Sequence, residues 1–394
     1  MSTTTGSTTV TVLTAEGRSA IAVVAVVGPL AEQAVDQYFR AANGKALAQQ
    51  PLARIVYGRW GSTTGEDLVI CRRDTSWIEV HCHGGVASIA QVVDHLVAAG
   101  CQQTTWQEWL ADHAADPLFL EAHTALAEAS TLRTAKVLLD QYHGALHCAM
   151  LAIRLLLSEG AARIAHEKLQ ELLGHAALGL HLTQPWRVVI AGLPNVGKSS
   201  LINALVGYQR AIVFDQPGTT RDVVTATTAI EGWPVSFSDT AGLHQTADEL
   251  ENKGIALARK RLSEADLVIW VLDAQEFESQ ETTSCEELIA RQLKTSGVEI
   301  DHCSLLLVVN KIDLLGDSAP NVENLCAVSA LAGTDLDTLL SMIANSLVPQ
   351  PPPTGVAIPF TARQVTLLKQ MAEHCQQEQC EQALETLAIF YQPS

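Results

Sequence analysis

The sequence predicts a multidomain protein of mixed α+β and α/β class. Its 394 residues exceed the roughly 150 residues typical of one domain, which indicates two or three domains. Three patterns support this class: β-branched apolar runs near the start, an Ala- and Leu-rich middle segment with helical periodicity, and alternating strand and helix signals from about residue 185 to residue 348. We therefore expect an N-terminal α+β domain, then a helical domain, then a doubly wound α/β domain.

The N-terminal domain is expected over residues 1–118. Thr9 to Leu13 alternates polar and apolar residues, and Ile21 to Val27 is an apolar β-branched run, so both are predicted strands. Val86 to Ala99 spaces its apolar residues at helical intervals, and Gly100 follows as a helix stop. Strands and helices thus share this domain.

The helical signal occupies residues 119–184 and returns near the end of the chain. From Glu121 to about Leu182 apolar residues recur at three- and four-residue intervals, which predicts a helical hairpin or part of a bundle. Pro349 to Pro353 cannot continue a helix and predicts a stiff linker. Thr361 to Phe390 is again helical by its period, so residues 349–394 form a linker and a C-terminal helical segment.

The composition indicates which partners the protein can bind and in which cellular compartment it lies. With 43 acidic and 25 basic side chains, the formal net charge of −18 disfavours non-specific binding to nucleic acid or anionic membranes, although it leaves a local RNA site open. The run from Ala20 to Val27 is too short to cross a bilayer, so no membrane association is expected. Nine dispersed cysteines without a CxxC pair suit reduced thiols. We expect a cytoplasmic protein.

A phosphate-binding motif lies in the α/β domain, which spans residues 185–348. Gly192-Leu-Pro-Asn-Val-Gly197-Lys198-Ser199 matches G-x-x-x-x-G-K-[ST] and falls after a predicted strand and before a predicted helix, Ser200 to Leu205. Such a loop offers backbone N–H groups, a helix N-terminus, a lysine charge and a hydroxyl for Mg²⁺. The predicted phosphate-binding residues are Asn195, Val196, Gly197, Lys198, Ser199 and Ser200.

Two further motifs accompany the phosphate-binding loop. Asp239-Thr240-Ala241-Gly242 comes after the strand Val235 to Phe237, where the carboxylate can hold a Mg²⁺ water and the Gly242 N–H can meet the γ-phosphate. Between the two motifs, Thr219 and Thr220 belong to Gly218-Thr-Thr-Arg-Asp222, and Thr220 is a candidate switch hydroxyl for Mg²⁺. Mg²⁺ is therefore expected on Ser199 and Thr220.

The base-reading residues follow the strand Leu305 to Val309. Asp313 can accept hydrogen bonds from guanine N1–H and the exocyclic amine, a pairing that adenine cannot offer. The backbone of the short loop at Ser329 and Ala330 can meet guanine O6. With Asn310 and Lys311, these residues predict that the bound nucleotide is GTP.

The group that positions the attacking water is less clearly marked. Leu243 follows the Asp239 motif, where Ras-like proteins carry a glutamine that orients water. Asp248, Glu249 and Glu251 all lie in the next segment, and spacing alone does not choose among them or exclude a merely solvated acidic loop.

The motifs resemble those of the MnmE (TrmE) family of tRNA modification GTPases. The resemblance is carried by Ala191 to Ser200, by Pro217 to Asp222, and above all by Asp239 to Glu251 followed by Gly254-Ile255. Thr64 to Leu68 and Glu79 to Gly85 resemble the family's N-terminal domain, and Thr131 to Leu146 resembles the start of its helical domain.

The resemblance implies an architecture and partners. In the family, a Ras-like P-loop GTPase domain is inserted into a helical domain, so the C-terminal helix would rejoin the helical domain. The N-terminal domain binds folate and forms a homodimer, and the partner protein is FAD-dependent. These properties imply a homodimer that acts on tRNA with such a partner.

The family resemblance also implies roles for individual residues. Glu251 aligns with the family's catalytic glutamate. Lys198, the lysine of the phosphate-binding motif, is the second predicted catalytic residue. Asn195 aligns with a K⁺ ligand; Phe214, Gln216 and Thr219 would complete the K⁺ loop, although Phe214 stands where a small hydroxyl residue is usual.

Two departures qualify the resemblance. Family members end in a Cys-x-Gly-Lys motif, whereas this sequence ends Phe390-Tyr-Gln-Pro-Ser394, so the usual thiol is missing. The family's Phe-Ser-Glu-Arg-Ala-Phe-like stretch is also missing, which makes folate binding doubtful.

Two functions remain open from the sequence. The first is an MnmE-like GTP hydrolase in tRNA wobble-uridine modification. The alternative is a regulatory GTPase switch, either of the ribosome-assembly type or a paralogue without modification chemistry, that acts by GTP-dependent binding.

Overall fold

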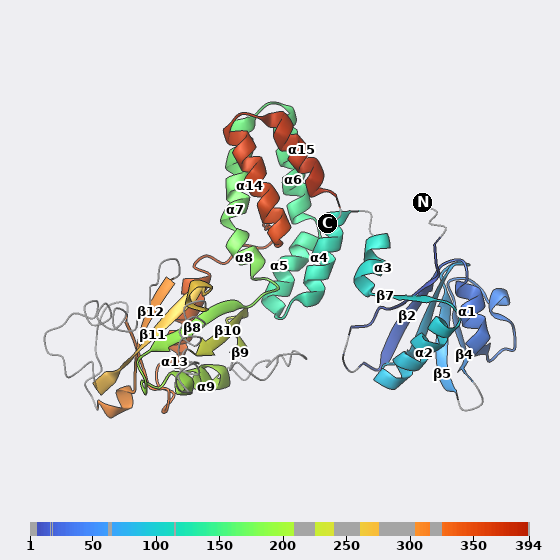
Figure 1. Ribbon diagram of the computed structural model, residues 1–394, viewed down its shortest axis with the longest axis horizontal. Coiled ribbons are helices and arrows are strands. Elements are labelled where there is room, and N and C mark those ends of the chain that lie inside the picture. Colours follow the sequence, from blue (N-terminus) through green and yellow to red (C-terminus); the bar gives the residue numbers. More distant parts are fainter. Residues whose placement is uncertain are drawn as a thin grey trace, which may run out of the picture. The chain divides into compact units, whose positions relative to one another are not determined.

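The computed structural model describes residues 6–15, 17, 19–61, 65–113, 116–208, 225–239, 261–275, 304–315 and 325–392. The chain divides into two compact units, Met1–Ala115 and Asp116–Ser394, which are described separately below and drawn in Figure 1. Within the described ranges, no helix combines the length and apolarity that a bilayer span requires.

The first unit is a seven-stranded sheet with strand order β3-β4-β5-β6-β2-β1-β7. Its strand pairs are antiparallel except for the parallel pair β1 and β7. The strands are β1 Thr9–Val12, β2 Ile21–Val27, β3 Phe39–Ala41, β4 Ile55–Trp60, β5 Glu66–Arg72, β6 Trp77–His83 and β7 Gln102–Thr104. The helices are α1 Ala31–Tyr38, α2 Val86–Ala98 and α3 Trp106–His113, with a 3₁₀ turn at Leu47–Gln49.

Alternate residues of the central strands form the core of this unit. Val24 and Val26 of β2 and Ile78 and Val80 of β6 are fully buried, and Leu96 of α2 joins the same cluster. Side chains two residues apart lie on the same face of a strand. These buried side chains therefore form one apolar face of the sheet, and helix α2 packs against it. The predicted strand at Ile21 to Val27 and the predicted helix from Val86 are confirmed.

The second unit begins with a helical bundle. Five of its described helices lie before the second sheet in the sequence, and two more come after residue 361. They are α4 Pro117–Glu128, α5 Leu132–Tyr142, α6 Ala145–Ser158, α7 Ala162–Gly174, α8 Ala176–Leu180, α14 Ala362–Gln376 and α15 Cys380–Phe390. In Figure 1 the late helices α14 and α15 lie beside the early helices α6 and α7, and residue contacts join these pairs.

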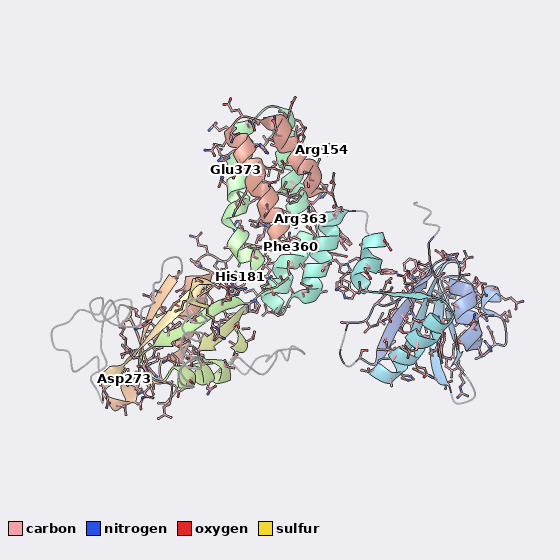
Figure 2. All side chains as sticks on the ribbon, viewed as in Figure 1. Arg154, His181, Asp273, Phe360, Arg363 and Glu373 are labelled. Carbon is pink, nitrogen blue, oxygen red and sulfur yellow. The ribbon has the colours of Figure 1, made fainter. Side chains whose placement is uncertain are left out.

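Buried polar side chains join helix α14, which follows the second sheet, to helix α4, which precedes it. Glu121 of α4 accepts from Arg363 Nε and from Gln364 Nε2, both at 2.7 Å. Gln364 is fully buried and also caps its own helix, because its Oε1 accepts from Phe360 N (2.8 Å) while the Thr361 hydroxyl accepts from Gln364 N. Arg363 and Phe360 are marked in Figure 2. The carboxylate of Glu121 and the side-chain amide of Gln364 thus have hydrogen-bond partners, and the two bonds to Glu121 join helices that are distant in the sequence.

The predicted helical segment Thr361 to Phe390 is not continuous, which corrects the expectation drawn from its period. The chain leaves the helix after Gln376, Glu378 adopts φ 56°, and α15 begins at Cys380. No Gly or Pro marks this reversal in the sequence, and apolar residues keep a helical period on both sides. The left-handed residue and helix packing therefore set the break, and neither can be read from periodicity.

The second sheet has six strands in the order β13-β12-β11-β8-β10-β9. Its strand pairs are parallel except for the antiparallel β9 and β10 pair. The strands are β8 Trp186–Gly192, β9 Thr225–Ile230, β10 Trp233–Asp239, β11 Leu267–Asp273, β12 Ser304–Asn310 and β13 Leu325–Val328. Helices α9 Lys198–Tyr208 and α13 Leu336–Leu347 and a 3₁₀ turn at Ile312–Leu314 accompany these strands.

The central strands of this sheet are apolar on both faces. In β11, Leu267, Ile269 and Val271 join one core cluster with α9 and α13, whereas Val268 and Trp270 join a second cluster on the other face. A strand buried on both sides is typical of a parallel sheet covered by other elements. This arrangement places the carboxyl ends of the parallel strands along one edge, where ligands bind in such folds.

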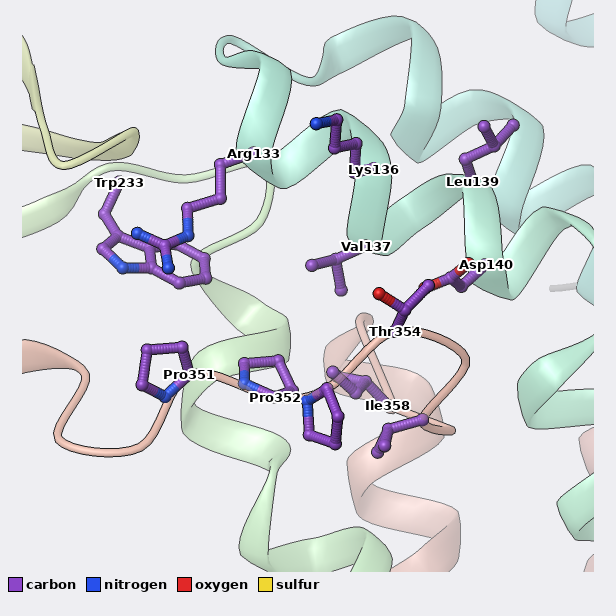
Figure 3. Close-up of a pocket in the computed structure, with 12 residues that line it drawn as sticks. Arg133, Lys136, Val137, Leu139, Asp140, Trp233, Pro351, Pro352, Thr354 and Ile358 are labelled. Carbon is purple, nitrogen blue, oxygen red and sulfur yellow. The ribbon is translucent and has the colours of Figure 1, made fainter.

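Helix α5 contacts the turn between β9 and β10. Arg133 donates from Nη1 to Glu231 O (2.6 Å), and its guanidinium lies 4.6 Å from the centre of the Trp233 ring. Beside these two side chains a cavity of about 390 Å³ lies between α5 and the Pro-rich segment after α13 (Figure 3). None of the predicted nucleotide-binding residues that the structure describes lines this cavity.

Candidate functional site

The predicted phosphate-binding loop joins the carboxyl end of β8 to the start of α9. Three of its residues have positive φ angles: Gly192 at 141°, Asn195 at 66° and Gly197 at 93°. Glycine adopts this region without strain, and asparagine tolerates it better than most residues. The loop therefore turns sharply enough to direct its backbone toward the first turn of α9.

Gly197 is required by space as well as by φ. A Cβ atom on Gly197 would collide with the Asn310 side-chain nitrogen. That nitrogen donates to Val196 O at 2.9 Å in a buried hydrogen bond. The amide of Asn310 can therefore pack against the loop only because position 197 has no side chain.

Lys198 is buried in the loop, with 5% of the residue exposed. Its ammonium donates to Gly192 O (3.0 Å) and Leu193 O (2.8 Å). Burial lowers the pKa of Lys198, and the Asp239 carboxylate offsets part of that decrease. The positively charged ammonium group of Lys198 thus lies within the loop, where a nucleotide phosphate would bind.

Ser199 and Asp239 meet although 40 residues separate them in the chain. Ser199 Oγ donates to Asp239 Oδ2 at 2.7 Å. Asp239 ends β10 and pairs in register with Ile190 of β8, which brings its carboxylate beside the loop. A hydroxyl and a carboxylate are oxygen donors of the type that Mg²⁺ prefers, so these residues fit the expected ion.

The predicted base-reading residues lie at the ends of the next strands along the same edge. Asn310 Oδ1 accepts from Ala330 N (3.0 Å), so its amide links the phosphate-binding loop to the loop after β13. The Ser329 hydroxyl donates to Asp313 Oδ1 at 2.5 Å. The Asp313 carboxylate is thus held in place, and its acceptor oxygens suit the two N–H donors on one edge of guanine.

Sequence reasoning missed Asp273, which ends β11 at this edge. Asp273 Oδ2 lies 2.7 Å from Lys311 Nζ, and Lys311 Nζ also donates to Asn195 O at 2.6 Å. A usable signal was present, because Asp273 ends a buried strand just as Asp239 and Asn310 do.

Eight predicted site residues lie outside the described residues, and their positions stay predictions. They are Phe214, Gln216, Thr219, Thr220, Thr240, Ala241, Gly242 and Glu251. The structure does bring together Asn195, Val196, Gly197, Lys198, Ser199, Asp239, Asn310, Lys311, Asp313, Ser329 and Ala330, and it places Ser200 in the first turn of α9.

Comparison with protein families and curated proteins agrees with this geometry. The family described as 50S ribosome-binding GTPase matches residues 187–311. The tRNA modification GTPase MnmE of Geobacillus kaustophilus is 32% identical over 362 residues, which cover 81% of this chain and 76% of the relative. The MnmE proteins of Koribacter versatilis (32%; 85% and 81% covered) and Desulforamulus reducens (30%; 86% and 82% covered) are similar over comparable lengths.

Solved structures with related sequences match only part of the chain. Era from Aquifex aeolicus is 27% identical and covers 47% of this chain and 66% of its own, with a TM-score of 0.30. The FeoB G-domain from Methanococcus jannaschii is 25% identical and covers 41% of this chain and 98% of its own, with a TM-score of 0.29.

We expect Gly197→Ala to weaken GDP and GTP binding by about 10- to 100-fold, because the new methyl group displaces Asn310 and strains a residue with positive φ. The matched control is Gly207→Ala in α9, where a Cβ atom meets no neighbour within 4 Å. Titration with a fluorescent guanine nucleotide measures both variants. Wild-type affinity in Gly197→Ala, or equal losses in both, would contradict the assignment of this loop.

Proposed function

Because the chain belongs to the MnmE family of tRNA modification GTPases, we propose that its GTP hydrolysis serves modification of the wobble uridine in tRNA. GTP hydrolysis is the activity of its P-loop domain. The observation that carries the proposal is the extent of the similarity, which covers 81–86% of the chain in these relatives and so reaches beyond the P-loop domain. Similarity of this extent favours a role in tRNA modification over a role as a regulatory switch.

The described residues suggest how the chain binds and polarises the phosphates. With GTP in the loop, phosphate oxygens take the place of the Gly192 and Leu193 carbonyls as partners of the Lys198 ammonium. That charge then faces the negative charge that develops on the transferred group. Ser199 and Thr220 would hold Mg²⁺ directly and Asp239 through water; the ion, when bound, neutralises charge on the β- and γ-phosphates.

The water-positioning group is proposed to be Glu251. A carboxylate can accept a proton or a hydrogen bond from the attacking water, and the chain has leucine where a water-orienting glutamine is otherwise found. A K⁺ ion held by Asn195, Phe214, Gln216 and Thr219 would add positive charge beside the phosphates. Family resemblance supports both assignments.

We propose that the P-loop domain is inserted into the helical domain. The domains would span residues 1–118, 119–184 and 185–348, and residues 349–394 would return to the helical domain. The contacts of Glu121 with Arg363 and Gln364 support this order, because they join helices on either side of the sheet in the sequence.

The partners follow from the family and are part of the proposal. A homodimer, tRNA and an FAD-dependent protein are the partners that we expect, and folate is left out because its sequence signature is missing. The seven described cysteines are all free, which suits a cytoplasmic protein.

Glu251→Ala should lower kcat for GTP hydrolysis by about 10²- to 10⁴-fold and leave the Kd for GTP nearly unchanged, because the carboxylate acts on water and not on the nucleotide. Asp248→Ala and Glu249→Ala are controls from the same segment and should keep wild-type kcat. A parallel loss of affinity and turnover in Glu251→Ala, or a loss of turnover in a control, would reject this assignment.

The function itself is tested by mass spectrometry of tRNA nucleosides. In a host with no other family member, deletion of the gene should remove a modified wobble uridine. The wild-type gene should restore it, and the Glu251→Ala gene should not. Unchanged nucleosides after deletion would refute the modification role while leaving the GTPase assignment to the kinetic experiment above.

A further inference from the structure

Asp273 occupies a central place at the edge that binds the nucleotide. It is the last residue of β11, which lies between β8 and β12 in the sheet. In register, Asp273 pairs with Asn310, and Val271 two residues earlier pairs with Gly192. Asp273, which is labelled in Figure 2, therefore lies between the strand that leads into the phosphate-binding loop and the strand that leads into the base-reading residues.

Both oxygens of this carboxylate are in use. Oδ1 accepts from Gln275 N at 3.0 Å, which fixes the orientation of the side chain at the strand end. Oδ2 pairs with Lys311 Nζ at 2.7 Å, and only 14% of the Asp273 side chain is exposed. Partial burial and a fixed carboxylate distinguish this pair from the exposed ion pairs that contribute little in proteins.

Lys311 in turn reaches the phosphate-binding loop. Its ammonium donates to Asn195 O at 2.6 Å, and Asn195 holds the left-handed φ of 66° that shapes the loop. Lysine loses more rotamer freedom than most side chains when it is fixed. An ammonium already held between Asp273 and Asn195 has therefore lost that freedom before a nucleotide arrives, which lowers the entropic cost of binding.

We propose that Asp273 is a positioning residue for the guanine-nucleotide site: it holds the Lys311 ammonium against the Asn195 carbonyl and so pre-orders the base-binding and phosphate-binding loops together. The proposal rests on the nucleotide site proposed above. Asp273 acts through Lys311 and touches no reacting atom. Its effect therefore appears in how tightly and how long the nucleotide is held, and not in the hydrolysis step.

The charge of Asp273 is what the role needs. Asp273→Asn keeps the size of the side chain and an oxygen for Gln275 N, but it leaves the partly buried Lys311 ammonium without its anionic partner. Asp273→Glu keeps the charge and changes the reach. The two variants thus separate the ion pair from the packing of the residue.

The test measures nucleotide release and turnover in the full chain. We expect Asp273→Asn to speed GDP release and raise the Kd for GDP by about tenfold, with kcat at saturating GTP within about twofold of wild type. Asp273→Glu should recover part of the affinity. Lys311→Ala should weaken binding as well, and adding it to Asp273→Asn should cost little more, because both changes break one interaction.

Glu264→Gln is the matched control. Glu264 pairs with Arg187 at 3.6 Å with both side chains about half exposed, so its loss should not alter GDP release. Unchanged release in Asp273→Asn, fully additive losses in the double variant, or equal losses of kcat and affinity together with a lower Tm would each overturn the proposal. A wild-type chain that binds no guanine nucleotide would instead refute the proposed function on which it rests.

Discussion

The side-chain amide of Asn310 links the parts of the proposed nucleotide site. Its nitrogen donates to Val196 O in the phosphate-binding loop, and its oxygen accepts from Ala330 N in the loop after β13. The bond to Val196 forms only because Gly197 has no Cβ to occupy the same space. One buried amide thus fixes the distance between the residues assigned to phosphate and those assigned to the base, and the site depends on that distance.

The sheet makes this link possible. Parallel strands end at a common edge, so residues far apart in the sequence meet where β8, β10, β11 and β12 finish. Ser199 meets Asp239 there, and Lys311 meets Asp273. The polar side chains at this edge form hydrogen bonds and ion pairs with one another, so charged groups can lie beside an apolar core without losing their partners. The helical bundle has its own polar contact at Glu121, which joins helices from before and after the sheet.

The sequence predicted those features that depend on local pattern. A glycine-rich loop after a strand, and acidic or amide residues at the ends of buried strands, predicted residues that the structure brings together at this edge, because parallel strands end side by side. Asp273 ends a buried strand but belongs to no motif, and its partner Lys311 is 38 residues away, so the pair was missed. The reversal at Glu378 was missed because its left-handed backbone is set by packing. Glu251 stays a prediction, since it lies outside the described residues.

The central claim is that this edge of the sheet reads guanine through Asp313. Its most direct test compares the affinities of GDP and xanthosine diphosphate for the wild-type chain and for Asp313→Asn. The wild type should prefer GDP by at least about tenfold, and the variant should reverse that preference, because an asparagine amide suits the xanthine edge. A variant that keeps its preference for GDP would contradict the assignment of Asp313 and with it the account of the site.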